Sequence, residues 1–388
     1  MRMQKYKLEE LGEFKNGVNF SSDKMGSGFP LVNVKDVTDN CLINDDRLAK
    51  VNLDLKPDSD YIAKEGDLFF VRSSVKFEGA GKVGLIRNLK EDTTHCGFII
   101  RYRLTNKNIA PLFLLYLFNA PRGRERLRNL ASGATIFNIS QTSLKTLEIE
   151  APPLPTQLKI TSILSAYDDL IENNLKRIKL LEEKAFLRYK GIMREEKLEE
   201  RSILNICYVT DGTHDSPKQQ VDGFYLVTGK HLIGGFIDFS SAYFISEADH
   251  DKIQKRSKVT NGDLVLSNIG TIGNVAIIDS PFEFSVKNVI IFKPYDSLYI
   301  SFLYCYLNSN EMQTRFQQES SGTSQRFISL AYTRALKVKL PNQDALKEFH
   351  QEVSSLLKLK SILNQQNTKL REARDILLLK LMNGQIVV

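Results

Sequence analysis

The sequence predicts an α+β protein in which two β-rich globular modules are joined by two long antiparallel coiled-coil helices, with pseudo-twofold symmetry. Three observations predict this fold. A block of sequence recurs 189 residues further along the chain, short strand-like runs fill most of each copy, and a segment with heptad periodicity follows each copy. We place the modules at residues 1–152 and 199–340, and the long helices at residues 153–198 and 341–388.

The repeat is clearest toward the end of each module. Residues 113–119, 132–133 and 147–152 align without a gap with residues 302–308, 321–322 and 336–341, and looser matches pair 28–32 with 223–227 and 65–69 with 261–265. The two modules should therefore share a fold. Between these anchors the copies diverge, either because one frame presents different contact residues or because duplicated copies drifted. A pseudo-twofold molecule of this kind suits a pseudo-twofold partner such as duplex DNA.

Short β-branched and aromatic runs bounded by Gly, Asp and Asn are typical of strands. The first module should have strands at residues 31–34, 67–71, 83–86, 97–102 and 147–149, with helix at 111–119 and in the stretch that follows. The second should have strands at residues 224–227, 263–266, 275–278, 288–292 and 336–338.

Both long helices carry an apolar seam with steps of three and four residues. The first seam is Ile160, Leu164, Tyr167, Ile171, Asn174, Ile178, Leu181 and Ala185, and the second includes Leu346, Phe349, Val353, Leu356, Lys360, Leu363, Asn367, Leu370, Arg374, Leu377 and Leu381. A helix of about 42 residues spans about 60 Å, ample to separate two modules by one DNA turn of about 34 Å. Asn174 and Asn367 could fix the register of the pair at some cost in stability, or could face solvent near a helix end.

The composition is that of an ordinary globular chain, with 388 residues, 42% of them hydrophobic and 26% charged. The start of the chain is polar, and the longest apolar run, residues 110–118, is far shorter than the roughly 20 residues that cross a bilayer. We therefore expect a cytoplasmic protein that has no membrane partner. The four cysteines lack the spacing of a disulfide frame or a zinc site.

The net charge of +7 is mild, so any DNA footprint must come from local clustering of basic residues. The densest cluster contains four arginines at alternate positions. A solvated helix face would have the same appearance, and the sequence leaves both interpretations open. The cluster is Arg122, Arg124, Arg126 and Arg128.

Residues 79–84 match the G-x-G-x-x-G pattern of dinucleotide-binding loops, but a strand follows where that motif needs a helix, and the second module lacks the pattern. A loop between two strands is the better interpretation. Both modules place groove-reading residue types in this loop and in a second loop after the repeated Ser-Gly, although surface loops are commonly polar. The DNA-binding candidates are Arg72, Ser73, Ser74, Lys76, Lys82, Arg122, Arg124, Thr135 and Asn138 in the first module and Ser267, Asn268, Thr271, Asn274, Ser324, Gln325 and Arg326 in the second.

Candidate catalytic and metal-binding residues are missing from the sequence. The five histidines are scattered, and none has the partners of a nucleophile or a metal site. His214 lies in an Asp-Gly turn, where it could be a turn residue or a contact residue. The tetrad with which an amino-methyltransferase holds its target amine is absent. We expect no catalytic residue, no metal and no cofactor on this chain.

Three segments resemble the specificity subunit of type I restriction-modification systems: the helix entry at 152–157, the helix body ending at 180–183, and the terminal stretch 369–386. The order of modules and helices along the whole chain is also similar to that family. The resemblance implies a non-catalytic subunit with two target-recognition domains, each of which reads one half of a bipartite site in double-stranded DNA.

The resemblance further implies that the helices set the spacing of the half-sites and dock two methyltransferase subunits. S-adenosylmethionine and ATP would bind to partner subunits, and restriction subunits would join the complex. One departure is that residues 186–190 differ from residues 375–379, so the two docking surfaces need not be equivalent. The alternative is a coiled-coil assembly scaffold whose β-rich modules bind protein.

Overall fold

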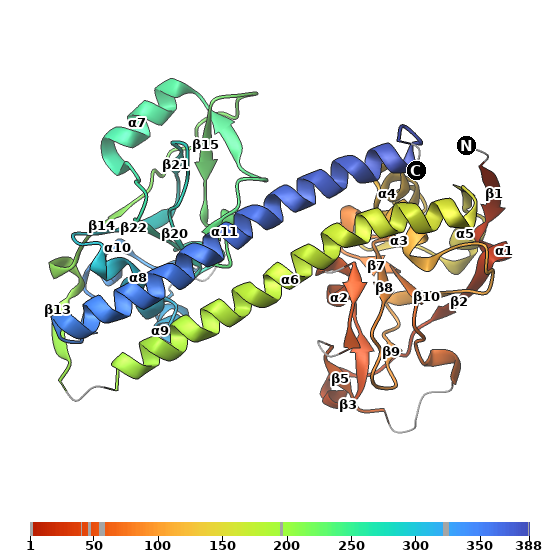
Figure 1. Ribbon diagram of the computed structural model, residues 1–388, viewed down its shortest axis with the longest axis horizontal. Helices are drawn as coiled ribbons and strands as arrows, with labels where there is room; N and C mark the ends of the chain where they lie inside the picture. Colours follow the sequence, from red (N-terminus) through yellow and green to blue (C-terminus); the bar gives the residue numbers. More distant parts are fainter. Residues whose placement is uncertain are drawn as a thin grey trace. The chain divides into compact units, whose positions relative to one another are not determined.

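The computed structural model describes residues 3–39, 41–45, 48–53, 59–194, 197–320, 326–386 and 388. The chain divides into two units, of which unit 1 comprises residues 1–171 and 369–388 and unit 2 comprises residues 172–368. Each unit therefore contains one globular module together with a part of each long helix (Figure 1).

Unit 1 is built on a five-stranded sheet whose two faces are both covered. Along the central strand β6, Leu68 and Phe70 enter one core, and Phe69 and Val71 enter a second core on the opposite face. This is why the strand reads as a continuous apolar run instead of alternating with polar residues. The sheet order is β2 (Gly12–Asn16), β10 (Ile99–Leu104), β6 (Leu68–Val71), β8 (Val83–Ile86) and β4 (Leu42–Ile43).

Smaller ladders complete unit 1. They are β1 (Gln4–Lys7) with β12 (Glu148–Ala151), β5 (Lys50–Val51) with β3 (Met25–Val32) and β9 (Thr94–His95), and β7 (Ser73–Ser74) with β11 (Phe137–Asn138). The short helices of the module are α1 (Leu8–Leu11), α2 (Val34–Asp39), α3 (Pro111–Asn119), α4 (Pro121–Asn129) and α5 (Gln141–Lys145).

Unit 2 repeats this plan. Its main sheet has the order β14 (Cys207–Asp211), β22 (Val289–Pro294), β19 (Leu264–Ser267) and β20 (Val275–Ile277). The other ladders are β13 (Glu199–Ser202) with β23 (Lys337–Leu340), β18 (Tyr243–Ile245) with β15 (Phe224–Val227) and β21 (Ser285–Val286), and β16 (Leu232–Ile233) with β17 (Phe236–Ile237). Its short helices are α7 (Glu247–Ser257), α8 (Leu298–Leu307), α9 (Asn310–Glu319) and α10 (Leu330–Arg334).

One ion pair occupies the same place in both modules. In unit 1, Arg103 on β10 donates to Asp67 at 2.6 Å, and in unit 2 Lys293 on β22 pairs with Asp263. Each aspartate also accepts a bond of 2.8 Å from the backbone nitrogen three residues before it. The repeated Gly-Asp thus forms a turn. The carboxylate of this turn is buried beside the neighbouring strand of the sheet, where it needs a cation. The predicted common fold is confirmed.

The predicted strands are confirmed, most of them to within two residues at each end. The largest difference is β3, which starts at Met25, six residues before the predicted Leu31. Helix α7 was not predicted. Its N-cap Ser246 accepts from the backbone of Asp249, but the helix has few apolar residues, so its sequence gave only a weak periodic signal.

The two long helices are α6 (Leu154–Ile192) and α11 (Gln343–Met382), and they pack together in each unit. In unit 1, Ile160 and Leu164 of α6 share a core with Leu378 and Leu381 of α11, and Figure 1 shows the end of α11 beside the start of α6. In unit 2, Ala185 and Tyr189 share a core with Leu346, Phe349 and Val353. Residue numbers fall along α11 as they rise along α6, so the predicted antiparallel pairing is confirmed.

The seam asparagines meet inside this pair. Asn174 donates its side-chain amide to Asn367 at 3.0 Å, and the two residues are 7% and 1% exposed. The alternative in which these positions face solvent near a helix end is therefore wrong. Among the described residues, no helix is both long and apolar enough to cross a membrane.

Candidate nucleic-acid interface

The glycine-rich loop of unit 1 carries a small β-ribbon. Strand β7 lies in the loop between β6 and β8 and pairs with β11, so that Ser74 is opposite Phe137 and Ser73 is opposite Asn138. The Ser73 hydroxyl donates to the Asn138 side-chain oxygen at 2.5 Å. The fold thereby brings the two predicted loops into one structure, although the contacting residues Ser73 and Asn138 are 65 positions apart in sequence.

The side chain of Arg124 binds the backbone of this loop. Its guanidinium donates to the carbonyl oxygens of Glu78 at 2.9 Å and Ala80 at 3.0 Å, and also to that of Gly81. Burial, together with the charge of Arg128, lowers the pKa of Arg124 to about 10. The side chain is therefore occupied inside the protein, and its role is to shape the loop.

The other arginines of α4 have different environments. Arg128 lies over the Phe77 ring at 5.9 Å, and Arg126 donates to the carbonyl of Glu148. Arg122 is exposed. The cluster is thus neither a purely solvated face nor four equivalent phosphate contacts, because at least three of its members are bound to the loop and the adjoining strand.

The remaining candidates of unit 1 surround the ribbon. Arg72 donates to the carbonyl of Gly97 at 3.4 Å, and Lys82 donates to that of Thr38 at 3.3 Å. The Ser74 hydroxyl donates to the Lys76 carbonyl at 2.7 Å. The side chains of Lys76 and Thr135 are exposed.

The basic charge of the chain gathers around this ribbon. Residues 72–82 and 121–139 contain seven Lys or Arg and two Asp or Glu, a net charge of +5 within a chain whose total is +7. Charge of this density attracts polyanions, and added salt weakens their binding. The local clustering that a DNA footprint requires is present here.

The equivalent loop of unit 2 is polar but nearly neutral. Ser267 and Asn268 are buried, and Asn268 donates to the carbonyl of Ile328 at 3.2 Å. Asn274 is exposed but donates its amide to the carbonyl of Leu232 at 2.9 Å, while Thr271 is exposed at the turn. The buried pair fixes the loop and cannot touch an external ligand in this conformation.

The second polar loop of unit 2 is described only in part. Ile269 forms an isolated antiparallel bridge with Phe327, the counterpart of the β7–β11 ladder of unit 1. Arg326 precedes this bridge and is exposed. The other two candidates in this loop, Ser324 and Gln325, lie outside the described residues.

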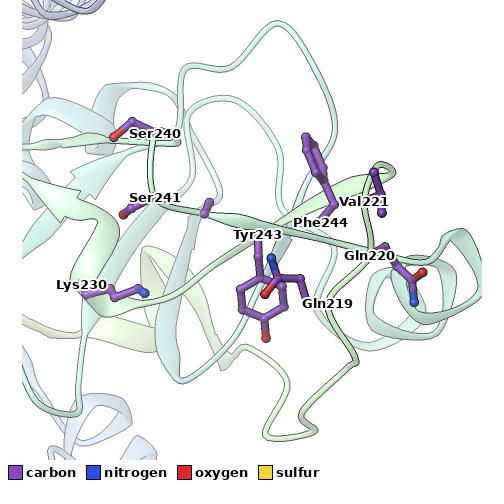
Figure 2. Close-up of a pocket in the computed structure, with 9 residues that line it drawn as sticks. Gln219, Gln220, Val221, Lys230, Ser240, Ser241, Tyr243 and Phe244 are labelled. Carbon is purple, nitrogen blue, oxygen red and sulfur yellow. The ribbon is translucent and has the colours of Figure 1, made fainter. Parts of the chain in front are cut away.

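A shallow groove of about 800 Å³ adjoins this surface of unit 2 (Figure 2). Tyr243 and Phe244 project to opposite sides of β18 in this view. The groove combines amides, hydroxyls, one lysine and aromatic rings, which are the groups that bind base edges and stack on bases. Its lining is Gln219, Gln220, Val221, Lys230, Ser240, Ser241, Ala242, Tyr243 and Phe244.

The groove and the loop of unit 2 meet at Gly229. A Cβ atom at this position would lie 2.8 Å from the Cβ of Ser267, so only glycine permits so close an approach. Lys230 of the groove follows directly. The groove could not be predicted from the sequence because its lining comes from three separate polar segments, none of which has a distinctive motif.

His214 lies in an exposed polar network of unit 2. Its ring nitrogens are 2.7 Å from the Asp211 carboxylate and 3.0 Å from the Asn288 side-chain oxygen, and Arg256 also pairs with Asp211. The imidazole is thus held by its own module. Within the described residues, no group of three or more His, Cys, Asp or Glu side chains is arranged to hold a metal ion.

Polar clamps connect each module to its part of the helix pair. In unit 1, the Tyr116 hydroxyl and the Arg374 guanidinium donate to the two oxygens of Asp168 at 2.5 and 2.6 Å. Burial and the Asp168 charge raise the pKa of Tyr116, so the hydroxyl stays protonated and remains a donor. Arg374 thus interrupts the apolar seam because it belongs to this clamp.

Unit 2 has a clamp of similar composition. Lys360 donates to the Tyr304 hydroxyl at 2.7 Å and pairs with Glu182. Burial alone would lower the pKa of Lys360, but Tyr304 and Glu182 raise it above its ordinary value, so the amine stays charged. Removal of one partner of such a buried pair leaves the other charge uncompensated, which is strongly destabilising.

Comparisons with known proteins agree on one family. The family described as a type I restriction modification DNA specificity domain matches residues 2–183 and 222–372. The chain is 25% identical to the type I restriction enzyme MjaIX specificity subunit of Methanocaldococcus jannaschii, with 98% of this chain and 93% of that protein covered. It is 24% identical to the EcoBI specificity subunit of Escherichia coli over 66% of this chain and 62% of that protein.

A solved structure has the same fold. The crystal structure of the type I restriction-modification system S subunit from M. genitalium is similar with a TM-score of 0.60 at 17% identity, covering 98% of this chain and 96% of that chain.

Proposed function

We propose, because this chain belongs to the family of type I restriction-modification DNA specificity subunits, that each module reads one half of a bipartite site in double-stranded DNA. The long helices would set the distance between the half-sites. A specificity subunit is the non-catalytic component of its enzyme, so the chemistry resides on its partners. We keep the boundaries 1–152, 153–198, 199–340 and 341–388 as the proposed functional division of the chain.

One observation carries this proposal. The order of four strands in the main sheet occurs twice, as β2-β10-β6-β8 and as β14-β22-β19-β20, and in both modules a glycine-containing loop pairs with a second loop, through β7 with β11 in unit 1 and through Ile269 with Phe327 in unit 2. Two copies of one frame with different loop residues are what the recognition of two different half-sites requires. Direct readout needs side chains that reach base edges, and the exposed loop and groove residues supply them.

The candidate residues divide by role. In unit 1 we assign direct contacts with DNA to Ser73, Lys76, Thr135 and Asn138 and a phosphate contact to Arg122, whereas Arg124 and Lys82 support the loop. In unit 2 we assign direct contacts to Thr271 and Arg326 and to the groove around Lys230 and Tyr243. Ser267 and Asn268 shape the loop because they are buried.

We assign the docking of partner subunits to the outer faces of the helices. Ten apolar side chains outside the seam remain exposed along the two helices, and they would supply the apolar surface that a partner subunit covers. In unit 1 they are Leu158, Ile163, Leu170, Ile376 and Leu379, and in unit 2 they are Leu175, Leu180, Leu187, Leu359 and Ile362. Two methyltransferase subunits would bind here and carry S-adenosylmethionine, and restriction subunits carrying ATP would join them.

Selection from a random DNA library tests the proposal. The purified chain, assembled with its methyltransferase subunits, is expected to enrich duplexes with two short defined sequences separated by a fixed number of undefined base pairs. A variant with Lys230→Ala and Tyr243→Ala should lose preference in one half-site and keep the other. Assembly of the complex without any sequence preference would instead support the protein-binding scaffold.

A further inference from the structure

Two branched apolar side chains stand at the tip of the β7–β11 ribbon of unit 1. Val75 is 76% exposed and Ile136 is 49% exposed. Val75 directly follows Ser74 and Ile136 directly precedes Phe137, and these two neighbours form the last pair of the ladder. Exposed apolar residues are common singly, but two at the tip of one projecting element require an explanation.

The tip is held in a fixed conformation. The backbone of Ser132 exchanges two hydrogen bonds with that of Asn138, at 3.0 and 2.8 Å. Gly133 has a φ of +126°, and a Cβ there would lie 2.0 Å from the Ile136 carbonyl oxygen, so the turn that presents Ile136 requires glycine. The Ser132-Gly133 pair of the first module thus has a local structural cause.

Strand β7, on the other side of the ribbon, is equally constrained. The Ser74 hydroxyl accepts from the Lys76 backbone nitrogen at 3.1 Å and donates to the Lys76 carbonyl at 2.7 Å, which closes a tight turn around Val75. Beneath the turn, Phe77 packs edge to face on Phe137 at 5.2 Å. Val75 and Ile136 are therefore already held in place, and binding of a ligand does not incur the entropy cost of ordering a loose loop.

The surroundings of the tip identify the partner. The net charge of +5 in the segments that build the ribbon favours a polyanion over an ordinary protein surface, and Lys76 lies beside Val75. A ligand that is polyanionic and also offers isolated methyl groups is duplex DNA, because the 5-methyl of thymine is the apolar group displayed in the major groove. An apolar side chain there distinguishes thymine from cytosine without a hydrogen bond.

We propose that Val75 and Ile136 read thymine through its 5-methyl group in the half-site bound by the first module. This inference rests on the proposed function and adds the chemical group that is recognised. Burial of one methyl is worth about a fourfold change in affinity. The ribbon would therefore add base specificity that the surrounding charges do not provide.

Replacement of single thymines by deoxyuridine tests this proposal, because deoxyuridine lacks only the methyl group. The complex with methyltransferase subunits is titrated with its selected duplex and with duplexes that carry one substitution each. In one half-site, at least one substitution should weaken binding about fourfold. Val75→Ser or Ile136→Ser should remove that difference, so that the two duplexes bind equally, while discrimination in the other half-site stays intact.

Leu204→Ser is the matched control, because Leu204 is also an exposed apolar residue but lies in a turn of unit 2 beside β13; it should retain the wild-type ratio of affinities. Equal binding of thymine and deoxyuridine by the wild type throughout both half-sites overturns the inference alone. The inference also fails if Val75→Ser prevents assembly with the methyltransferase in the absence of DNA, since the tip would then bind protein. A wild-type complex that selects no bipartite site overturns this inference together with the proposed function.

Discussion

Replacing both seam asparagines with leucine should stabilise unit 2. The Asn174–Asn367 pair makes one side-chain hydrogen bond in a buried position, and within the described part of the chain the amide nitrogen of Asn367 has no acceptor. Two buried leucines add about 1.5 to 3 kcal/mol each, and the lost hydrogen bond and packing changes offset part of that gain. We expect a net gain of about 2 to 4 kcal/mol.

The single variants should behave differently. Asn174→Leu leaves the Asn367 amide buried without its partner, which costs about 1 to 3 kcal/mol and cancels most of the hydrophobic gain. Singles should therefore be nearly neutral, and the double variant should exceed their sum by about 2 kcal/mol. In the native seam, a slip of one heptad would separate the two amides and incur the same cost at each, which is how the pair selects one register.

Differential scanning calorimetry of the chain measures this effect. For a unit of this size, each kcal/mol shifts the melting temperature by roughly 2 to 4 °C, so the double variant should melt about 4 to 16 °C higher in the transition assigned to unit 2. Ile178→Leu, a seam change that conserves volume, is the control and should move the transition little. A double variant that melts at or below the wild type, or single effects that simply add, would refute the reasoning.

Three further predictions concern charge, spacing and pH. Arg122→Gln should reduce the slope of log K against log salt for DNA binding by about 0.9 without changing stability, whereas Arg124→Gln should increase proteolysis of the 78–81 loop; equal behaviour of the two variants would contradict their assigned roles. Adding one heptad to both helices, about 10.5 Å of rise, should add about three base pairs of 3.4 Å to the selected spacer, and adding it to one helix should destroy the pairing; an unchanged spacer after the matched insertion would count against a ruler. Burial lowers the pKa of His95 to about 4, below its unfolded value of about 6.5, so unit 1 should lose about 3 kcal/mol of stability as the pH falls from 6.5 to 4; His95→Gln should flatten this dependence in chemical denaturation.

The repeat and the heptads were sufficient to predict most of the architecture. Strands β6 and β19 could be located because each is a short apolar run after a Gly-Asp turn, and the turn itself depends on local backbone bonds. The periodicity also assigned both asparagines to the seam, but it left open whether they face the partner helix or solvent, and the structure shows them buried together. The sequence did not indicate which cation pairs with each turn aspartate, because Arg103 and Lys293 belong to another strand.

The candidate site was predictable as two loops but not as a surface. Ser267, Asn268 and Arg124 have the same residue types as exposed DNA-reading side chains, and only their packing shows that they hold loops together. Arg374 and Lys360 could be seen only as interruptions of a seam, because the tyrosine that each clamp needs belongs to a globular module.

The sequence by itself determined the elements whose cause is local or periodic: the paired modules, the long helices, the glycine turns and the excess of basic residues in two segments of the first module. The tertiary structure alone decided which polar side chains face water, which join the β7–β11 ribbon, and how the groove of unit 2 forms from three segments. The physical reason is that burial and hydrogen-bond partners depend on residues far apart in the chain, and no local pattern records which of them will meet.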